Sequence, residues 1–275
     1  MDAYCLMGNP VEHSKSPWIH GRFAALTGQP VEYTKRLVTL DGFAAAIEAF
    51  RAEGGCGCNV TVPFKFEAAA LATETTERAR LAGACNTLRF DGERLFADNT
   101  DGAGLINDIQ SNAGVALAGR DVLLVGAGGA GAGALGPLLA ARPRRVRVLN
   151  RHADKAAQLV QRHAYLAAAG GTDLSAGGLE APQGAYDVVI NATSSSLLGL
   201  PVPVPGSVLR PGALAVDLMY GPKAEGFMAW AREHGAVPRD GLGMLIEQAA
   251  EAFFIWRGVR PPSATVMDEF RNGMA

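Results

Sequence analysis

Five short stretches of the sequence place small polar side chains and a few charged ones beside apolar segments. Together they offer hydroxyls, amides, the carboxylate of Asp101 and the ammonium of Lys65. Such a set of donors and acceptors suits a small ligand that carries several hydroxyl groups. The stretches are GNPVEHSKSPWIH (8–20), NVTVPFK (59–65), GACNT (83–87), DNTDG (98–102) and MLIEQAA (244–250).

Each stretch also has a purely structural interpretation. Lys65 follows a short β-branched strand and could be a solvated lysine that opens the next helix. Ser14 or Ser16 could cap a helix, Asn86 could be a turn residue, and Asp101 could be the favourable charge of a helix N-terminus. The sequence holds no competing metal-ligand cluster and no Ser-His-Asp set, so we expect no metal site.

A glycine-rich loop follows the predicted strand DVLLV (121–125) and opens an alanine-rich helix. Without Cβ atoms the loop can turn tightly and let a pyrophosphate approach its backbone, where the helix N-terminus adds positive potential. The pattern could instead serve packing alone, but its strand, turn and helix context favours dinucleotide binding. The loop residues are Gly126, Ala127, Gly128, Gly129, Ala130 and Gly131.

The end of the next predicted strand indicates which dinucleotide binds. An NAD enzyme would place an acidic residue there for the ribose 2′-hydroxyl, but this chain has Asn150 and Arg151, with Lys155 one turn later. A guanidinium pairs well with a 2′-phosphate, so the sequence favours NADP. The alternative is a generic basic surface made by Arg142, Arg144, Arg145, Arg147 and Arg151.

The elements that must position these groups alternate between short apolar strands and helices. One series covers residues 3–62 and a second covers 120–220, which predicts two α/β domains with mostly parallel sheets. A helix from Asp101 leaves the first series. The helical segment from Gly241 onward follows the second sheet, and we expect it to pack against the first domain. Two Gly- and Pro-rich segments are expected to be surface loops: 170–185 and 197–207.

Composition narrows the class of protein. The 275 residues are 48% hydrophobic with a formal net charge of −2, so the chain can bury sizeable cores and has no overall basic field for nucleic acid. We expect no leader peptide and no membrane span. The four cysteines are few for this length, and we expect them to be reduced in a cytoplasmic protein.

Taken in order, these motifs resemble the shikimate dehydrogenase family over nearly the whole chain, with NR at 150, NATS at 191–194 and DGLGMLIEQAA at 240–250 in addition. The resemblance implies NADP-dependent, reversible reduction of 3-dehydroshikimate to shikimate, a step of aromatic amino acid biosynthesis. It also implies a cleft between a discontinuous substrate domain, 1–101 plus 240–275, and a Rossmann-type NADP-binding domain, 102–239. The expected assembly is a monomer or homodimer.

The resemblance also implies roles for individual residues. Lys65 and Asp101 would be the catalytic pair. The residues expected to bind substrate are Ser14, Ser16 and Tyr220 at its carboxylate, and Thr61, Asn86 and Gln248 at its ring hydroxyls. The residues expected to bind the cofactor, besides the glycine loop, are Asn150, Arg151 and Lys155 at the 2′-phosphate, and Thr193, Leu218, Gly241 and Met244 toward the nicotinamide.

Four positions depart from the family's usual pattern. Gly21 replaces an asparagine, His152 a threonine, Lys155 an arginine, and Ser196 a glycine. The exchange at Lys155 replaces a planar guanidinium by a point charge, which weakens bidentate recognition of a phosphate.

The resemblance gives Lys65 a specific task. Hydride delivery to a ketone creates alkoxide character on its oxygen, which an ammonium can stabilise and protonate, while Asp101 orients the lysine and offsets its charge. The sequence leaves open which of the two is the formal acid or base. It also leaves open a paralogue that acts on quinate or an aminoshikimate, with NAD, and a redox sensor that binds a dinucleotide without turnover.

Overall fold

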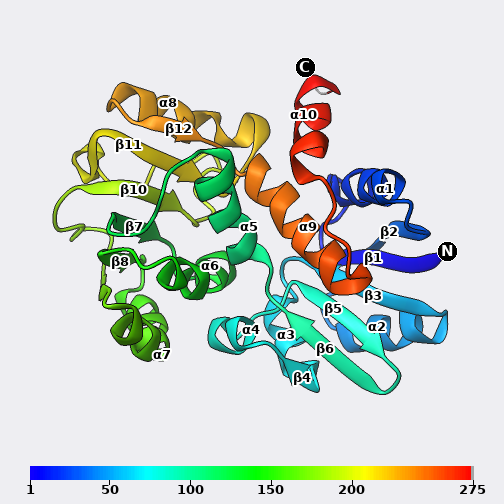
Figure 1. The fold of residues 1–275 in the computed structure, drawn as a ribbon. Helices are drawn as coiled ribbons and strands as arrows, with labels where there is room; N and C mark the ends of the chain where they lie inside the picture. The colour runs from blue at the N-terminus through cyan, green and yellow to red at the C-terminus, as the bar shows by residue number, and fades with distance from the viewer. Residues whose placement is uncertain (274–275) are drawn as a thin grey trace. The chain divides into compact units, whose positions relative to one another are not determined.

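The computed structural model describes residues 1–273, which form two compact units, each built on one six-stranded sheet (Figure 1). Unit 1 comprises Met1–Gly104 and the described residues from Leu245 onward, and unit 2 comprises Leu105–Met244. Both sheets carry helices, which confirms the predicted class of two α/β domains. Within the described residues, no helix is both long enough and apolar enough to cross a bilayer.

The sheet of unit 1 has the strand order β2-β1-β3-β5-β6-β4. β1 lies parallel to β2 and β3, whereas β5 lies antiparallel to β3 and β6. β4 also lies parallel to β6, so three of the five pairings are parallel, as expected of a mostly parallel sheet. The sequence did not predict the hairpin of β5 and β6, where a two-residue connection at Gly92, with φ 63°, returns the chain. The strands are β1 (Asp2–Gly8), β2 (Val31–Leu37), β3 (Gly55–Val60), β4 (Glu74–Thr75), β5 (Thr87–Asp91) and β6 (Arg94–Asp98).

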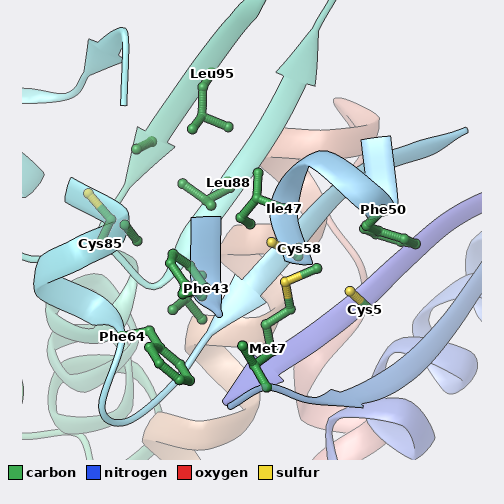
Figure 2. Close-up of a cluster of buried hydrophobic side chains, with 14 of the residues drawn as sticks. Cys5, Met7, Phe43, Ile47, Phe50, Cys58, Phe64, Cys85, Leu88 and Leu95 are labelled. Atoms are coloured by element: carbon green, nitrogen blue, oxygen red, sulfur yellow. The ribbon is translucent and has the colours of Figure 1, made fainter. Parts of the chain in front are cut away.

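Helices cover both faces of this sheet, because successive strand residues point to opposite sides. Cys5 and Met7 of β1 face a core that includes Phe43 and Phe64, whose rings stack with centroids 4.9 Å apart (Figure 2). The helices of unit 1 are α1 (Ser16–Thr27), α2 (Phe43–Ala52), α3 (Lys65–Leu71), α4 (Glu77–Ala82) and α10 (Ser263–Gly273), while α5 (Asp101–Asn107) and α9 (Leu242–Arg257) cross the boundary between the units.

The opposite face of β1 packs against α9. Tyr4 stacks on Trp256 with ring centroids 4.5 Å apart, and the Trp256 indole N–H donates to the carbonyl of Leu88 at 3.0 Å. His20 of α1 lies in the same layer, stacked on Tyr33 at 4.2 Å, and burial lowers its pKa to about 3. These contacts confirm the expectation that the last helical segment packs against the first domain.

The sheet of unit 2 is fully parallel, with the doubly wound order β12-β11-β10-β7-β8-β9. The edge strand β9 lies inside the segment predicted to be a surface loop, so that expectation was wrong. β9 reads DLSAG and carries too few apolar residues to signal a strand, yet it pairs with β8 along its length. The strands are β7 (Asp121–Val125), β8 (Arg145–Leu149), β9 (Asp173–Gly177), β10 (Tyr186–Asn191), β11 (Leu209–Asp217) and β12 (Val237–Arg239).

Helices also cover both faces of the second sheet. Phe227 of α8 joins Leu123 and Ala215 of the sheet in one core, and α6 packs against α7. Pro137 lies inside α6. The helices are α6 (Gly129–Ala140), α7 (Ala153–Gly170), α8 (Glu225–Glu233), the π-helical turn η1 (Asp108–Asn112) and the 3-10 turns η2 (Gly206–Val208) and η3 (Gly221–Ala224).

Candidate active site

Lys65 and Asp101 form an ion pair in unit 1, with the Lys65 Nζ 2.5 Å from the Asp101 Oδ2. Lys65 opens α3 just after β3, and Asp101 opens α5 just after β6. Their side chains are 17% and 8% exposed. Lys65 is thus not the fully solvated lysine of the structural interpretation, because it is held beside a buried carboxylate.

Asn86 connects this pair to α9. Its amide Nδ2 donates to the Asp101 Oδ1 at 2.8 Å and to the Gln248 Oε1 at 3.2 Å. The Gln248 amide in turn donates to the carbonyl of Leu245 at 2.8 Å, which fixes its orientation. The structure therefore brings together four residues that the sequence singled out, from four separate stretches.

Asn86 is held by a layer of buried polar side chains. The sequence assigned no role to the residues of this layer. The Asn86 Oδ1 accepts hydrogen bonds from the Thr87 hydroxyl at 3.0 Å and from the Thr100 backbone N–H at 2.8 Å. Asn59 donates to Thr87 at 3.1 Å and accepts from the Tyr33 hydroxyl at 2.8 Å. The available signal was that three of the quoted stretches each contain a further small polar residue close to the assigned one.

The two serines of the first stretch lie together. The Ser14 hydroxyl donates to the Ser16 Oγ at 3.1 Å and accepts from the Ser16 N–H at 3.2 Å. Neither serine is the N-cap of α1, which is Lys15 without a side-chain capping bond. Thr61 lies in the partly exposed turn after β3, where its N–H donates to the carbonyl of Met7 at 2.9 Å.

The glycine loop of unit 2 has the geometry of a backbone cradle at the carboxyl end of β7. Gly126 adopts φ 114°, and a Cβ there would lie 2.8 Å from the backbone of Ala192. A Cβ on Gly131 would lie 2.0 Å from the Gly126 oxygen, whereas one on Gly128 would meet nothing within 4 Å. The loop is therefore closed on its protein side and open at Gly128, which fits a pyrophosphate beside the N-terminus of α6.

The end of β8 fits a 2′-phosphate. The Asn150 Oδ1 accepts from the Ala127 N–H at 3.2 Å, so this side chain ties the strand end to the glycine loop. Arg151 and Lys155 are exposed, and no carboxylate of the described chain forms an ion pair with either. Two cations near the strand end, where an NAD enzyme would place an acidic residue, suit NADP better than NAD.

Three of the other arginines do not form one basic surface with Arg151. Arg144 and Arg145 reach the buried carboxylate of Asp121 at the opposite end of the sheet, at 2.6 and 3.2 Å. Arg147 is buried and donates to the carbonyl of Ala181 at 3.0 Å. These three side chains serve the fold, which leaves Arg151 as a separate feature at the cofactor end.

The remaining predicted residues lie in unit 2, beyond the carboxyl ends of β10, β11 and β12. Thr193 donates to the Asn191 Oδ1 at 2.7 Å, the Leu218 N–H donates to the Asn191 carbonyl at 3.0 Å, and the Gly241 N–H to the Met219 carbonyl at 2.8 Å. The structure thus groups these loops around Asn191. Two further predicted residues are Tyr220, half-buried at the start of η3, and Met244, buried in the first turns of α9.

A doubly wound parallel sheet with an open glycine loop, joined to a second α/β unit that holds a lysine–aspartate pair, defines a dinucleotide-dependent oxidoreductase. Family models agree along the chain: residues 6–88 match the shikimate dehydrogenase substrate binding domain, 108–201 shikimate / quinate 5-dehydrogenase, and 241–269 the shikimate 5′-dehydrogenase C-terminal domain.

Individual relatives extend this match to the full length. The chain is 65% identical to the shikimate dehydrogenase (NADP(+)) of Acidovorax sp. (strain JS42) over 100% of its own length and 97% of the relative's. An Ael1 enzyme from Pseudomonas putida has a similar crystal structure, with TM-score 0.90, 45% identity and 98% of each chain covered. Shikimate 5-dehydrogenase of Thermus thermophilus, solved with NADP(H) and shikimate, gives TM-score 0.82 at 29% identity over 99% of each chain. The chain belongs to the shikimate dehydrogenase family.

Proposed function

We propose that the protein catalyses the reversible, NADP-dependent reduction of 3-dehydroshikimate to shikimate, a step of aromatic amino acid biosynthesis. The observation that carries this proposal is the Lys65–Asp101 pair at 2.5 Å, in a chain with 65% identity to an NADP-dependent shikimate dehydrogenase. Asn86 donates to Asp101 and also to Gln248. The alternatives of a quinate or aminoshikimate enzyme and of a non-enzymatic redox sensor are not favoured.

In the proposed reaction, Lys65 acts at the oxygen of the reacting carbonyl. Bound NADPH supplies the hydride. The Lys65 ammonium stabilises the negative charge that develops on the oxygen and transfers a proton to it. In the oxidation direction the amine accepts that proton. Asp101 keeps Nζ in position and offsets its charge, and Asn86 holds Asp101 from the other oxygen.

The proposed substrate contacts follow the polar groups of the stretches. The hydroxyls of Ser14 and Ser16, with that of Tyr220, would bind the carboxylate of shikimate. Thr61, Asn86 and Gln248 would join the catalytic pair at the ring hydroxyls, since all three present groups that donate or accept hydrogen bonds. The Tyr220 hydroxyl is protonated at neutral pH and can donate a hydrogen bond, and burial raises its pKa further above the ordinary tyrosine value.

The proposed cofactor contacts divide into three sets. The backbone of the glycine loop would bind the pyrophosphate. The second set, Asn150, Arg151 and Lys155, would bind the 2′-phosphate. The third set would line the nicotinamide and consists of Thr193, Leu218, Gly241 and Met244. Accordingly, residues 1–101 plus 240–275 would act as the substrate domain and 102–239 as the NADP domain.

We further propose that the protein works in the cytoplasm, as a monomer or a homodimer. The four cysteines are all free thiols, and Cys5, Cys58 and Cys85 are buried in the core of unit 1, which is typical of proteins from a reducing compartment. Sedimentation of the purified protein distinguishes the two assemblies.

The decisive experiment measures the absorbance of the reduced nicotinamide during oxidation of shikimate or quinate with NADP or NAD. We expect the highest kcat/KM for shikimate with NADP. Preference for quinate with NAD would contradict the proposal in both substrate and cofactor, and binding of NADP without turnover of either substrate would favour the sensor.

A further inference from the structure

Asp217 is a fully buried carboxylate at the functional end of unit 2, and no role in the proposed reaction has been given to it. It is the last residue of β11 and pairs in register with Asn191, the last residue of β10. The carboxyl ends of parallel strands are where ligands of this fold bind. Among the described residues, no arginine or lysine forms an ion pair with Asp217.

Three hydrogen-bond donors take the place of a cation. The Ser196 hydroxyl donates to the Asp217 Oδ2. The Met219 backbone N–H donates to the Oδ1 at 3.1 Å, and the Asn191 amide donates to the same oxygen at 3.3 Å. Both oxygens of a buried carboxylate are therefore satisfied, although burial still raises its pKa above the ordinary range for aspartate.

These bonds join three separate pieces of backbone. Ser196 belongs to the loop after β10, whose Thr193 also bonds to Asn191. Met219 belongs to the turn after β11, and its carbonyl accepts the Gly241 N–H at 2.8 Å. A Cβ on Gly241 would lie 2.3 Å from the Leu218 oxygen, so these segments are in close contact. Asp217 thus fixes the spacing of the loops that carry Thr193, Leu218 and Gly241.

We infer that Asp217 and Ser196 are positioning residues for hydride transfer. They hold in place the loops of Thr193, Leu218 and Gly241, against which the nicotinamide ring would pack. This inference depends on the proposed function, because it assigns the nicotinamide to these loops. Rates of group transfer depend steeply on the placement of the reacting atoms, so a small displacement of these loops slows the chemical step. The affinity for NADP depends on the distant pyrophosphate and 2′-phosphate contacts, so it changes little.

The hydrogen-bond pattern also predicts which substitution is tolerated. An amide at position 217 can accept from Met219 and Asn191 through its oxygen and donate to the Ser196 oxygen through its nitrogen. Asp217→Asn therefore preserves the three connections while it removes the charge. Asp217→Ala removes all three connections. Ser196→Ala removes the connection from Ser196 to Asp217, together with the hydrogen bond that the Asn191 amide donates to the Ser196 Oγ at 3.3 Å.

The experiment compares Ser196→Ala, Asp217→Asn and Asp217→Ala with the wild type in the oxidation of shikimate. The readouts are kcat, the Kd of NADP in the absence of shikimate, and the deuterium isotope effect on kcat with shikimate labelled at the reacting carbon. Thr172→Val is the matched control, because it removes another buried hydroxyl of unit 2, bonded to the Pro143 carbonyl at 2.7 Å.

We expect Ser196→Ala to lower kcat about tenfold and to raise the isotope effect, since hydride transfer then limits the rate, with the Kd of NADP changed less than about threefold. Asp217→Asn should keep kcat within about threefold of wild type, and Asp217→Ala should lose more than Ser196→Ala. The control should match the wild type in all three readouts.

Several outcomes would overturn the inference. One is a wild-type kcat and isotope effect in Ser196→Ala, and another is a loss of NADP affinity as large as the loss of kcat. If Asp217→Asn fell as far as Asp217→Ala, charge rather than hydrogen-bond geometry would be the operative property. If Asp217→Ala does not fold, the other two variants decide. Lack of any turnover by the wild type would refute the proposed function itself.

Discussion

The two regions that carry the candidate site use different chemical groups: side chains in unit 1 and the backbone in unit 2. In unit 1 side chains bond to side chains: Lys65 to Asp101, Asp101 to Asn86, and Asn86 to Gln248. In unit 2 the glycine loop offers backbone groups, and Gly128 faces open space. The first region depends on particular functional groups held in place, and the second depends on the absence of side chains. Substitutions should therefore act differently in the two regions.

The largest effect should come from the side-chain region. We expect Lys65→Ala to lower kcat by at least about a hundredfold with little change in the KM of shikimate, because the ammonium acts mainly on charge that exists only in the transition state. Steady-state kinetics in both directions measure this. Lys35→Ala, which removes an exposed lysine of the same unit, is the control. A loss confined to KM would make Lys65 a binding residue only.

Substitutions in the cofactor region of unit 2 should change the preference for NADP over NAD. If the Arg151 guanidinium pairs with the 2′-phosphate, Arg151→Ala removes about 1.5–3 kcal/mol, or about ten- to a hundredfold in affinity for NADP, and leaves NAD unaffected. Adding Lys155→Ala should increase the loss, although the two effects need not add.

The measurement is kcat/KM for both cofactors at fixed shikimate and fixed salt, because screening weakens exposed phosphate contacts. Arg162→Ala removes an exposed positive charge further along α7 and should leave the preference unchanged. An equal loss of NADP and NAD activity in Arg151→Ala would mean that the residue supports the fold or the adenine pocket.

A smaller effect should separate binding from catalysis within unit 1. Ser14→Ala should raise the KM of shikimate about tenfold and leave kcat nearly unchanged, because a carboxylate anchor acts equally in the ground and transition states. Since the Ser14 and Ser16 hydroxyls bond to each other at 3.1 Å, the double variant should lose less than the sum of the two. Undiminished affinity in Ser14→Ala would move the carboxylate site elsewhere.

The smallest expected effect concerns the layer behind the unit 1 site. The His20 pKa is about 3 in the folded protein, below the ordinary histidine value of 6.5, so the fold favours the neutral ring. The neutral His20 ring contributes fully to the free energy of unfolding above the pKa of histidine in the unfolded chain. This contribution is lost as the pH falls from that value toward the folded-state pKa. Between about pH 7.5 and pH 6, wild type should lose about 1 kcal/mol that His20→Phe keeps.

Hydrogen exchange of the α9 amides at the two pH values measures this difference, since α9 packs on the same layer as His20. His13→Gln, a change at an exposed histidine, should retain the wild-type pH dependence. An unchanged pH dependence in His20→Phe would mean that other groups control the acid sensitivity of unit 1.

The sequence predicted groups that lie at the ends of strong elements better than groups that depend on packing. Lys65, Asn86 and Asp101 stand near the ends of apolar strands, which marked them as candidates, and their grouping was expected from the family resemblance. The glycine loop was recognised because its strand and helix are unambiguous. The hairpin of β5 and β6 was missed because parallel alternation dominated the first sixty residues, and β9 was missed because its residues carry little apolar signal.

The supporting polar layer could not be predicted, for a different reason. Thr87 and Ser196 are ordinary small polar residues, and their importance depends on which buried group lies opposite them in the fold. The sequence marks a residue that departs from hydrophobic periodicity, but it does not say what that residue meets. The partner is set by tertiary packing between strands, and sequence spacing carries little of that information.

The packing of β1 against α9 has a consequence for synthesis on the ribosome. Asp2 and Arg257 form an ion pair across 255 positions, and Tyr4 stacks on Trp256. All of unit 2 is translated between these residues, so it can fold while the apolar face of β1 still lacks its cover. Unit 1 is therefore begun first and completed last, and the apolar face of β1 stays exposed in the nascent chain until α9 has been made.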